Sequence, residues 1–387
     1  MLDALTWPQI FAALALQLWP VWLAMVVLFA ASISFKRSLG LYGKLFDSKV
    51  GMVGFALVIF WVFTALFADM IVTHDPLAQF SGMRNAVPGS ALRDPGDGYP
   101  HFLLGGDALA RDVFSRMVMG SREVLRIAPF AAMISFMIGI SLGLPAGYIG
   151  GKLDTGLTFV ANLVLAFPVI LLFFLLVAPE IQNTAIPRVM AGVLFLMPVL
   201  FFTLLLNARY FTQPMKRNLY VGVVLLVGLW AYSGLAFNAD PLGFWGMSPN
   251  LLNVFVAVVF VNAPTVFRIV RGITLDIKTR DYVAAAQTRG EGPWYIMLWE
   301  ILPNARGPLI VDFCLRIGYT TILLGTLGFF GLGVAPESPD WGSTINQGRR
   351  LLTVYPHAAL APALALMSLV LGLNLLADGL REESLKD

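Results

Sequence analysis

The chain has 387 residues, of which 58% are hydrophobic and only 13% charged, with a mean hydropathy of +0.78. Soluble proteins average ~45–50% apolar and ~25% charged residues, so this composition excludes a soluble domain and indicates a polytopic membrane protein. The single cysteine, Cys314, excludes an intramolecular disulfide framework, and a net charge of +3 gives no case for nucleic-acid binding.

Nine apolar segments are each long enough to cross the ~30 Å hydrocarbon layer, which takes ~20 helical residues. They lie near residues 9–34, 50–73, 127–150, 154–178, 189–208, 219–237, 251–270, 307–330 and 358–378. Pro145 and Pro168 fall inside two of these segments and predict kinks, which neighbouring membrane helices can accommodate. We therefore expect an all-α polytopic membrane protein with about nine transmembrane helices.

The distribution of lysine and arginine predicts how these helices are oriented. No basic residue precedes the first span, whereas Lys36, Arg37, Lys44 and Lys49 follow it, so the positive-inside rule places the N-terminus outside. After nine crossings the C-terminus lies in the cytoplasm. The first segment has no basic n-region and exceeds the ~7–15 apolar residues of a signal-peptide core. We expect a retained helix there; the alternative is an anchor lying in the membrane surface.

Residues 74–126 form the largest predicted segment outside the membrane. A turn-rich first half is followed by HFLLGGDALARDVFSRMVMGSREVL, which runs from His101 to Leu125. Between Ala108 and Leu125 apolar residues recur at about helical spacing, so we expect a helix along the outer membrane face. Its charged residues are expected either to stay in water or to pair.

Two features follow on the predicted inner side. GYIGGKLD, ending at Asp154, is a short turn that makes its two flanking helices adjacent and antiparallel. Between residues 180 and 249, two apolar segments are joined by NARYFTQPMKRN, whose Arg209, Lys216 and Arg217 place that joint inside. We expect this helix pair to pack at the periphery of the core or to contact another subunit.

The longest polar interruption in the second half of the chain spans residues 271–306, also on the predicted inner side. Residues 281–288 are rich in alanine and free of proline and glycine, which predicts about two helical turns. Gly290, Gly292 and Pro293 then end the helix. A short helix of this kind is suited to being pushed by a soluble partner; the alternative is an ordinary amphipathic loop helix.

The next span carries Asp312 and Arg316, which are four residues apart and lie on one helix face. An unpaired charge in a bilayer costs ~2.5–3.5 kcal/mol or more, so we expect the two to pair or to lie in a hydrated cytoplasmic region. They could instead line a substrate path. Beyond this span, GFFGLGVAPESPDWGSTINQGRRLL combines close-packing glycines with prolines and Trp341, which predicts a stiff turn at the outer interface.

The polar segment 271–306 resembles the EAA loop of ABC-transporter permeases, in which EAA, three residues, glycine, nine residues and I-x-L-P form the coupling helix that docks on an ATPase. Here alanine occupies 284 and glutamate occupies 300, in place of the family's glutamate and first isoleucine. We expect the contact to depend on small-residue packing at Ala285 and Ala286. The ATPase-coupling residues implied are Asp281, Tyr282, Ala284, Ala285, Ala286, Gly290, Leu302 and Pro303.

The two outer segments narrow the resemblance to the C-type subunit of the oligopeptide/dipeptide permeases. The first resembles HPLGTDxxGRDVxSRxxxGxRxSL, with Gly106 and Ala110 replacing Thr and Gly, and the second resembles FLGLGxxPPxPxWGxxLxxG, including Pro336. The first segment is expected to form part of the extracytoplasmic vestibule where a binding protein docks. The signature positions are Leu104, Gly105, Asp107, Arg111, Asp112, Ser115, Arg116, Gly331, Gly333, Trp341 and Gly342.

The resemblance covers about residues 45–178 and 250–387 and implies a type I importer core of six helices, to which this chain adds three. The implied parts are an extra helix with a cytoplasmic linker (1–49), the first core part (50–178), an inserted helix pair (179–249) and the second core part (250–387). The implied partners are a homologous second permease, two ATP-binding-cassette ATPases that hold ATP and magnesium, an extracytoplasmic binding protein and membrane lipid. The implied location is a bacterial or archaeal inner membrane.

No GxxxxGK[ST] phosphate-binding sequence occurs, so we expect a non-enzymatic pore subunit without a cofactor of its own. His74, His101 and His357 are far apart and have no cysteine partners, so no metal site is expected. One alternative is a secondary transporter, for which only the Asp312/Arg316 region supplies ionisable groups. Another is a permease-derived scaffold that no longer transports. The expected substrate is a peptide, with a nickel chelate, an opine, glutathione or an oligosaccharide as alternatives.

Overall fold

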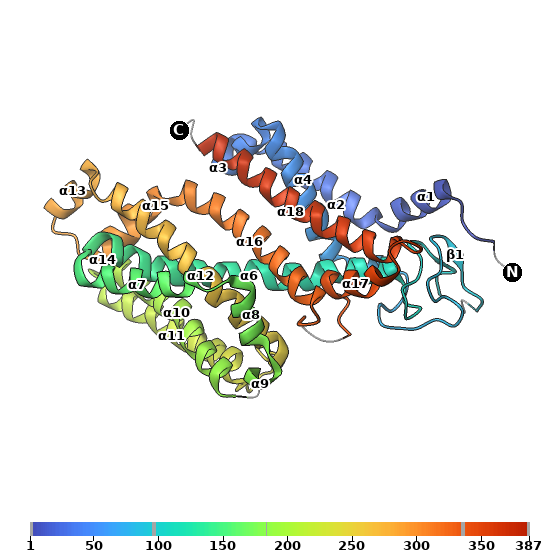
Figure 1. The fold of residues 1–387 in the computed structure, drawn as a ribbon. Helices are drawn as coiled ribbons and strands as arrows, with labels where there is room; N and C mark the ends of the chain where they lie inside the picture. Colours follow the sequence, from blue (N-terminus) through green and yellow to red (C-terminus); the bar gives the residue numbers. More distant parts are fainter. Residues whose placement is uncertain (1–2, 95–97, 183, 334–336, 385–387) are drawn as a thin grey trace. The chain divides into compact units, whose positions relative to one another are not determined.

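The computed structural model describes residues 3–94, 98–182, 184–333 and 337–384, so Pro336 lies outside the described residues. The chain divides into two compact units, one made of residues 1–129 and 314–387 and the other of residues 130–313. Nearly all regular structure in the described part is helical (Figure 1). The only strands described there are β1 (Ser90–Ala91) and β2 (His101–Phe102), paired antiparallel with Ser90 opposite Phe102.

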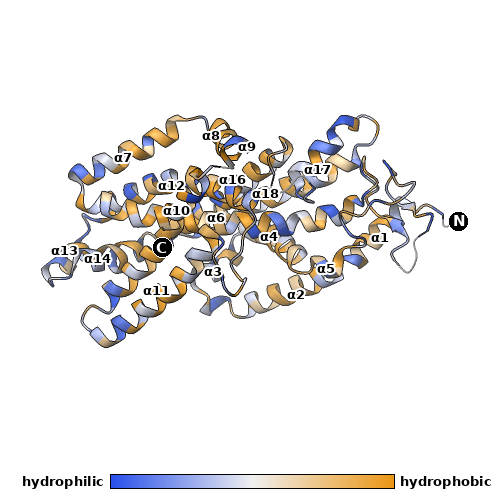
Figure 2. Cartoon of the chain, turned by 90° about the horizontal axis from the view of Figure 1, so that it is seen from below, coloured by the Kyte–Doolittle hydropathy of each residue, from blue (hydrophilic) through white to orange (hydrophobic). Residues whose placement is uncertain are grey.

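Within the described residues, seven helices are long and apolar enough to cross a membrane, and two bent helix pairs raise the number to nine if each pair is one span. Hydrophilic residues gather at the helix ends and in the loops (Figure 2). The prediction of an all-α polytopic fold with about nine spans is confirmed. The seven helices are α4 (Lys49–Leu66), α6 (Val113–Ile149), α10 (Ile186–Arg209), α11 (Pro214–Phe237), α12 (Pro249–Ile277), α16 (Arg306–Phe329) and α18 (His357–Ser384).

The two bent pairs are α1 (Trp7–Gln17) with α2 (Trp19–Ser34), bent by 57°, and α7 (Gly151–Ala166) with α8 (Val169–Val177), bent by 84°. Between α7 and α8, Phe167 is extended (φ −77°, ψ 135°) because the proline that follows disfavours the helical conformation. The kink predicted at Pro168 is therefore confirmed. Pro145 lies inside α6.

In the unit of residues 1–129 and 314–387, α4 and α18 pack backbone to backbone. A Cβ atom on Gly54 would lie 2.3 Å from the Leu376 amide nitrogen. The Trp61 indole N–H donates to the Ser368 hydroxyl at 2.8 Å, which ties the same two helices together. The shorter elements of this unit are η1 (Lys36–Ser38), α3 (Gly40–Lys44), η2 (Leu45–Asp47), α5 (Ala68–Ile71), α17 (Trp341–Gly348) and η4 (Arg349–Leu351).

In the unit of residues 130–313, α12 packs closely on the second half of α6. Gly139, Gly143 and Gly147 recur every fourth residue, and a Cβ atom on any of them would lie within 2.5–2.9 Å of an α12 atom. Small residues at this spacing let two membrane helices approach closely. The inserted helices α10 and α11 lie side by side, with only 17% and 11% of their apolar windows buried, against 72% for α12. The inserted pair is therefore peripheral within this unit. The short element α9 (Pro179–Gln182) precedes it.

The start of α6 differs from the prediction. We expected a separate surface helix over residues 108–125 and a span from 127, but α6 is one helix of 37 residues that begins at Val113. Arg122 and Arg126 end the apolar window in the sequence without ending the helix. Arg122 is neutralised by a bidentate ion pair with Asp69, at 2.8 and 2.9 Å, so its charge does not oppose continuation of α6.

Candidate functional site

The helix in the polar segment 271–306 is α13 (Asp281–Thr288), with the bounds that the sequence predicts. Val283 and Ala286 are fully buried, and their spacing of three residues places them on one face of the helix. This face packs into a cluster that includes Val270, Ile296, Met297 and Ile301. The helix is thus anchored along one side only.

The opposite side of α13 is exposed. Asp281, Ala284, Ala285 and Gly290 are all accessible, and 37% of Tyr282 is exposed. Desolvation raises the pKa of the Tyr282 hydroxyl above its ordinary value. We expected Ala285 and Ala286 both to pack against the partner, but the structure gives them different environments. Ala285 can meet a partner, whereas Ala286 lies in the chain's own core.

The C-terminal end of α13 is closed by a Schellman motif. The Glu291 amide donates to the Ala286 carbonyl at 3.2 Å, and the Gly290 amide donates to the Gln287 carbonyl at 2.9 Å. Gly290 has φ +79°, a conformation that residues with a Cβ atom rarely adopt. The glycine predicted to end this helix therefore has a defined backbone role.

The chain returns from α13 through α14 (Pro293–Tyr295), the π-helix η3 (Ile296–Ile301) and α15 (Leu302–Asn304). Glu300, one of the two departures from the family pattern, accepts a hydrogen bond from an Arg289 guanidinium nitrogen at 2.8 Å. This ion pair ties the end of α13 to the π-helix. Leu302 is half-buried and Pro303 is exposed beyond it.

The inserted helix α10 contacts this loop directly, within the unit of residues 130–313. The Trp299 indole N–H donates to the Leu205 carbonyl at 3.3 Å, and the Arg209 guanidinium carbon lies 4.6 Å from the centroid of the Trp299 ring. Ala208 is buried in the same cluster as Val283. Sequence reasoning missed this contact because no spacing rule links residues about ninety positions apart.

The turn between α6 and α7 is also fixed to the polar segment 271–306, the expected coupling loop. The Arg271 guanidinium donates to both carboxylate oxygens of Asp154, at 2.7 Å for the bond to Oδ2. The Lys278 ammonium donates to the Gly147 carbonyl at 2.8 Å, and the Gln287 amide donates to the Tyr148 hydroxyl at 3.0 Å. The end of α12 is therefore tied to this turn by two side chains, and α13 is tied to it by Gln287.

A second set of predicted residues meets at the start of α6, in the other unit. The Asp112 side chain accepts hydrogen bonds from the amides of Phe114 and Ser115, as an N-cap residue does. Its Oδ2 atom also accepts from the hydroxyls of Thr73 (2.7 Å) and Ser115 (2.6 Å). His74 Nδ1 lies 3.1 Å from the same oxygen. The carboxylate therefore joins the beginning of the outer loop to the helix that ends it.

Asp107, Arg111 and Arg116 form a buried charge cluster next to this cap. Arg111 pairs with Asp107 at 2.6 Å, and the Arg116 Nε atom lies 3.8 Å from the same carboxylate. The side chains of all three are at most 4% exposed. The alternative of a solvated charge face is wrong for these residues, and the alternative of pairing is confirmed.

The two outer signatures, more than 220 positions apart, come together here. Arg116 donates to the Thr344 hydroxyl at 3.0 Å and to the Ser338 carbonyl at 3.2 Å, while Arg111 donates to Gln347. The Trp341 indole donates to the Met117 carbonyl at 2.8 Å. The signature residues hold the outer loop and α17 together from inside.

Asp340 caps α17, and its Oδ1 atom accepts from the Ser343 amide at 2.9 Å. Burial raises the pKa of the Asp340 carboxyl above its ordinary value, although Ser343 and Arg116 act in the opposite direction. Gly342 packs closely on the backbone of Gly325, since a Cβ atom on Gly342 would lie 2.1 Å from the Gly325 carbonyl oxygen. A Cβ atom on Gly333 would lie 3.2 Å from Asp340 Oδ2.

The remaining predicted positions have simpler environments. Leu104 packs against a cluster that includes Leu103 and Phe114, and Gly105 and Gly331 adopt φ +82° and φ +80°. Asp312 and Arg316 are both half-buried on α16, and the Arg316 guanidinium carbon lies 5.8 Å from the Tyr319 ring centroid. Among the residues that the structure describes, no group of three or more His, Cys, Asp or Glu side chains is arranged to hold a metal ion.

An all-α fold with up to nine candidate spans in its described residues defines a polytopic membrane protein, and its loop helix α13 is anchored on one side and exposed on the other. The chain belongs to the family described as "Binding-protein-dependent transport system inner membrane component", which matches residues 139–382. The "N-terminal TM domain of oligopeptide transport permease C" matches residues 43–88.

Curated relatives are similar over most of their length. The glutathione transport system permease protein GsiD of Pectobacterium atrosepticum is 32% identical over 72% of this chain and 70% of the relative. The GsiD protein of Escherichia coli O6:K15:H31 is 30% identical over 86% of this chain and 85% of the relative. The dipeptide transport system permease protein DppC of Alkalihalophilus pseudofirmus is 26% identical over 88% and 87%.

The chain is accordingly a translocation-pathway subunit of an ABC importer of the oligopeptide/dipeptide type and a multi-pass inner-membrane protein. It is not an enzyme, because in this family separate subunits hydrolyse ATP. Membership implies that it works with ATPase and substrate-binding partners.

Proposed function

We propose that this chain, together with a homologous second permease, forms the path by which short peptides enter the cell. The substrate class comes from the relatives, whose names refer to dipeptides, di- and tripeptides, and the tripeptide-sized glutathione. A peptide of two or three residues is the chemistry that they share. An extracytoplasmic binding protein delivers it, and the buried signature cluster keeps the outer loop in the shape that this delivery requires.

Two ATPase subunits drive the cycle, one of them docked on the exposed side of α13, with ATP and magnesium bound by the ATPases. The observation that carries this proposal is the one-sidedness of α13. Val283 and Ala286 hold the helix to its own unit, while Tyr282, Ala284 and Ala285 are left accessible. With alanine at 284, the contact is made by packing of small residues and not by a carboxylate.

The orientation that this requires has the N-terminus outside and the C-terminus and α13 in the cytoplasm. The positive-inside rule supports it, because the joint between α10 and α11 and the segment around α13 carry arginine and lysine on the same predicted side. In this orientation the Asp107–Arg116 cluster lies on the extracytoplasmic side.

Cysteine protection tests the docking surface and the orientation together. The only native cysteine, Cys314, is buried, so a Cys314→Ser background leaves a single introduced thiol. Ala285→Cys should react with a membrane-impermeant maleimide in inside-out vesicles and lose most of that reactivity when the ATPase subunits bind. Met215→Cys is the matched control, because Met215 is 87% exposed on the same predicted side but lies outside the loop.

The Met215→Cys thiol should react equally with and without ATPase. Equal labelling of Ala285→Cys in both conditions would refute docking on α13, and labelling only in right-side-out vesicles would refute the orientation. Uptake of radiolabelled dipeptide and of glutathione into proteoliposomes holding the assembled importer tests the substrate. Uptake of neither would contradict the peptide assignment.

A further inference from the structure

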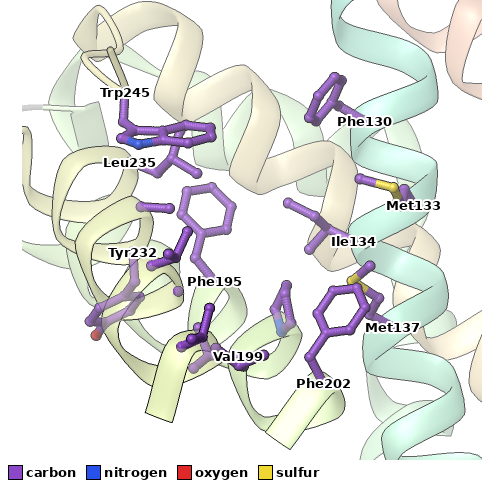
Figure 3. Close-up of a pocket in the computed structure, with 16 residues that line it drawn as sticks. Phe130, Met133, Ile134, Met137, Phe195, Val199, Phe202, Tyr232, Leu235 and Trp245 are labelled. Carbon is purple, nitrogen blue, oxygen red and sulfur yellow. The ribbon is translucent and has the colours of Figure 1, made fainter. Parts of the chain in front are cut away.

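An apolar groove of about 440 Å³ lies between α6, α10 and α11, within the unit of residues 130–313 (Figure 3). Of its sixteen lining side chains, only Tyr232 and Trp245 carry a polar atom. The others are Phe130, Met133, Ile134, Met137, Phe195, Pro198, Val199, Phe202, Val223, Val224, Val227, Gly228, Ala231 and Leu235.

The groove has a buried floor and an open rim. Ile134, Phe195 and Val199 form the floor and are at most 7% exposed, whereas Phe130 and Val223 on the rim are more than half exposed. The groove therefore opens away from the unit through the face formed by the peripheral helices, whose surroundings in a membrane are hydrocarbon.

The length of the groove matches one leaflet of a bilayer. Along α11 its lining runs from Val223 to Leu235, which at 1.5 Å per residue is about 18 Å, against about 15 Å for half of the hydrocarbon layer. Trp245, in the connection between α11 and α12, closes one end (Figure 3). Tryptophan favours the boundary between hydrocarbon and headgroups, so this end marks the interface.

The lining also decides the chemistry of the occupant. No charged side chain lines the groove to pair with the ends of a peptide, so a transported peptide would be desolvated there without compensation. A flexible chain of methylene groups fits, because Met133 and Met137 adapt to irregular shapes and aliphatic side chains supply the remaining contacts. Since lipid tails are as apolar as the groove, retention comes from van der Waals packing in a concave surface.

We propose that this groove holds one acyl chain of a membrane phospholipid, drawn from the leaflet on the side of the α11–α12 connection. The inserted helices α10 and α11 supply most of the lining, so the insertion creates a lipid site. The proposal does not depend on which peptide the importer carries.

Photolabelling with a phospholipid that carries a diazirine in its acyl chain tests the site in the full chain, both in phosphatidylethanolamine/phosphatidylglycerol vesicles and in native membranes. Labelled peptides should come from residues 130–137 and 223–235. Ala231→Phe fills the groove from α11 and should reduce this labelling at least fivefold. Val227→Trp does so from the rim, as a second variant in case the first fails to fold.

Leu226→Phe is the matched control, because Leu226 lies on the same helix, is 73% exposed and does not line the groove. It should leave the labelling unchanged. Equal labelling of the Ala231→Phe, Val227→Trp and Leu226→Phe variants would show ordinary surface lipid only and overturn the proposal. Labelling in vesicles that disappears in native membranes would also overturn it, because another protein would then cover the groove.

Discussion

Arg289 and Glu300, eleven residues apart in sequence, form an ion pair of 2.8 Å that joins the end of α13 to the π-helix η3. Glu300 stands where the family pattern has isoleucine, so the chain gains a polar connection at a position that is usually apolar. Because 54% of the Arg289 side chain is exposed, the pair contributes only about 0–1 kcal/mol to stability. What the pair provides is a direct connection between the end of α13 and η3.

Arg289→Glu should therefore reduce the number of substrate molecules imported per ATP hydrolysed, about two- to fivefold, with little change in thermal stability. The new carboxylate would then repel Glu300 and also Glu291, which lies 4.0 Å from Arg289. The charge-swapped double variant, with Glu300→Arg added, should recover most of the ratio. The matched control is Arg280→Glu, because Arg280 pairs with Asp276 at 3.2 Å on the opposite end of α13. A double variant no better than the single one would contradict this role.

The contact between Arg209 and Trp299 predicts that the inserted helix α10 supports the coupling loop. Arg209→Met keeps the length of the side chain but removes the charge above the indole, at an expected cost of about 0.5–1 kcal/mol. Trp299→Phe should cost more, because it also removes the hydrogen bond to the Leu205 carbonyl. The two changes should be less than additive because both disrupt the same cation–π contact. Thermal unfolding of the four proteins in a double-mutant cycle measures the coupling.

Arg217→Met is the control for this cycle, since Arg217 is half-buried in the same joint and its guanidinium donates to the Asn218 side chain at 3.3 Å. Full additivity of the Arg209 and Trp299 variants would show that the two side chains merely lie near each other.

The sequence predicts the spans and α13 well because both depend on local patterns. A long apolar segment must be helical in hydrocarbon, and residues 281–288 contain nothing that breaks a helix. Their burial could not be predicted in the same way. Residues 284, 285 and 286 are all alanine, so the sequence does not distinguish them. Ala286 is buried because Ile296 and Met297 pack in the same cluster against its face of the helix.

In the outer loop, the sequence misplaces the start of a helix. Hydropathy places the start of the predicted span at residue 127 because Arg116, Arg122, Glu123 and Arg126 are charged, yet α6 begins at Val113. Those charges are tolerated through partners far away in sequence, such as Thr344 for Arg116 and Asp69 for Arg122. A sequence pattern identifies such residues but does not reveal with which groups they pair.

Ala110, which replaces the glycine of the pattern HPLGTDxxGRDV, adopts φ +60° in the outer loop. A left-handed backbone costs a residue with a Cβ atom roughly 1–2 kcal/mol. Ala110→Gly should therefore raise stability by about 0.5–1 kcal/mol after the greater freedom of glycine in the unfolded chain is subtracted. Ala108→Gly, in the same loop but without a positive φ, should not stabilise. Differential scanning fluorimetry in detergent compares them, and an equal effect of the two changes would exclude relief of backbone strain.

Asp107 is the carboxylate on which the buried arginines depend. Asp107→Ala would leave Arg111 and Arg116, both at most 4% exposed, without their negative partner. Removing one member of a buried ion pair costs about 3–5 kcal/mol, because the remaining charge stays out of water. Asp107→Asn should recover only part of this loss, since an amide can accept the hydrogen bonds of the arginines but carries no charge. Arg84→Ala, at an exposed position in the same loop, is the control and should be nearly neutral.

The same variants distinguish a structural role of this cluster from direct contact with a binding protein. A structural role predicts that Asp107→Ala lowers the melting temperature of the isolated chain in detergent, with no other protein present. A role confined to docking predicts normal stability and weaker binding of the substrate-loaded binding protein. Because the Asp107, Arg111 and Arg116 side chains are almost completely inaccessible, we expect the first result. Unchanged thermal stability combined with lost binding would show that the cluster opens to meet its partner.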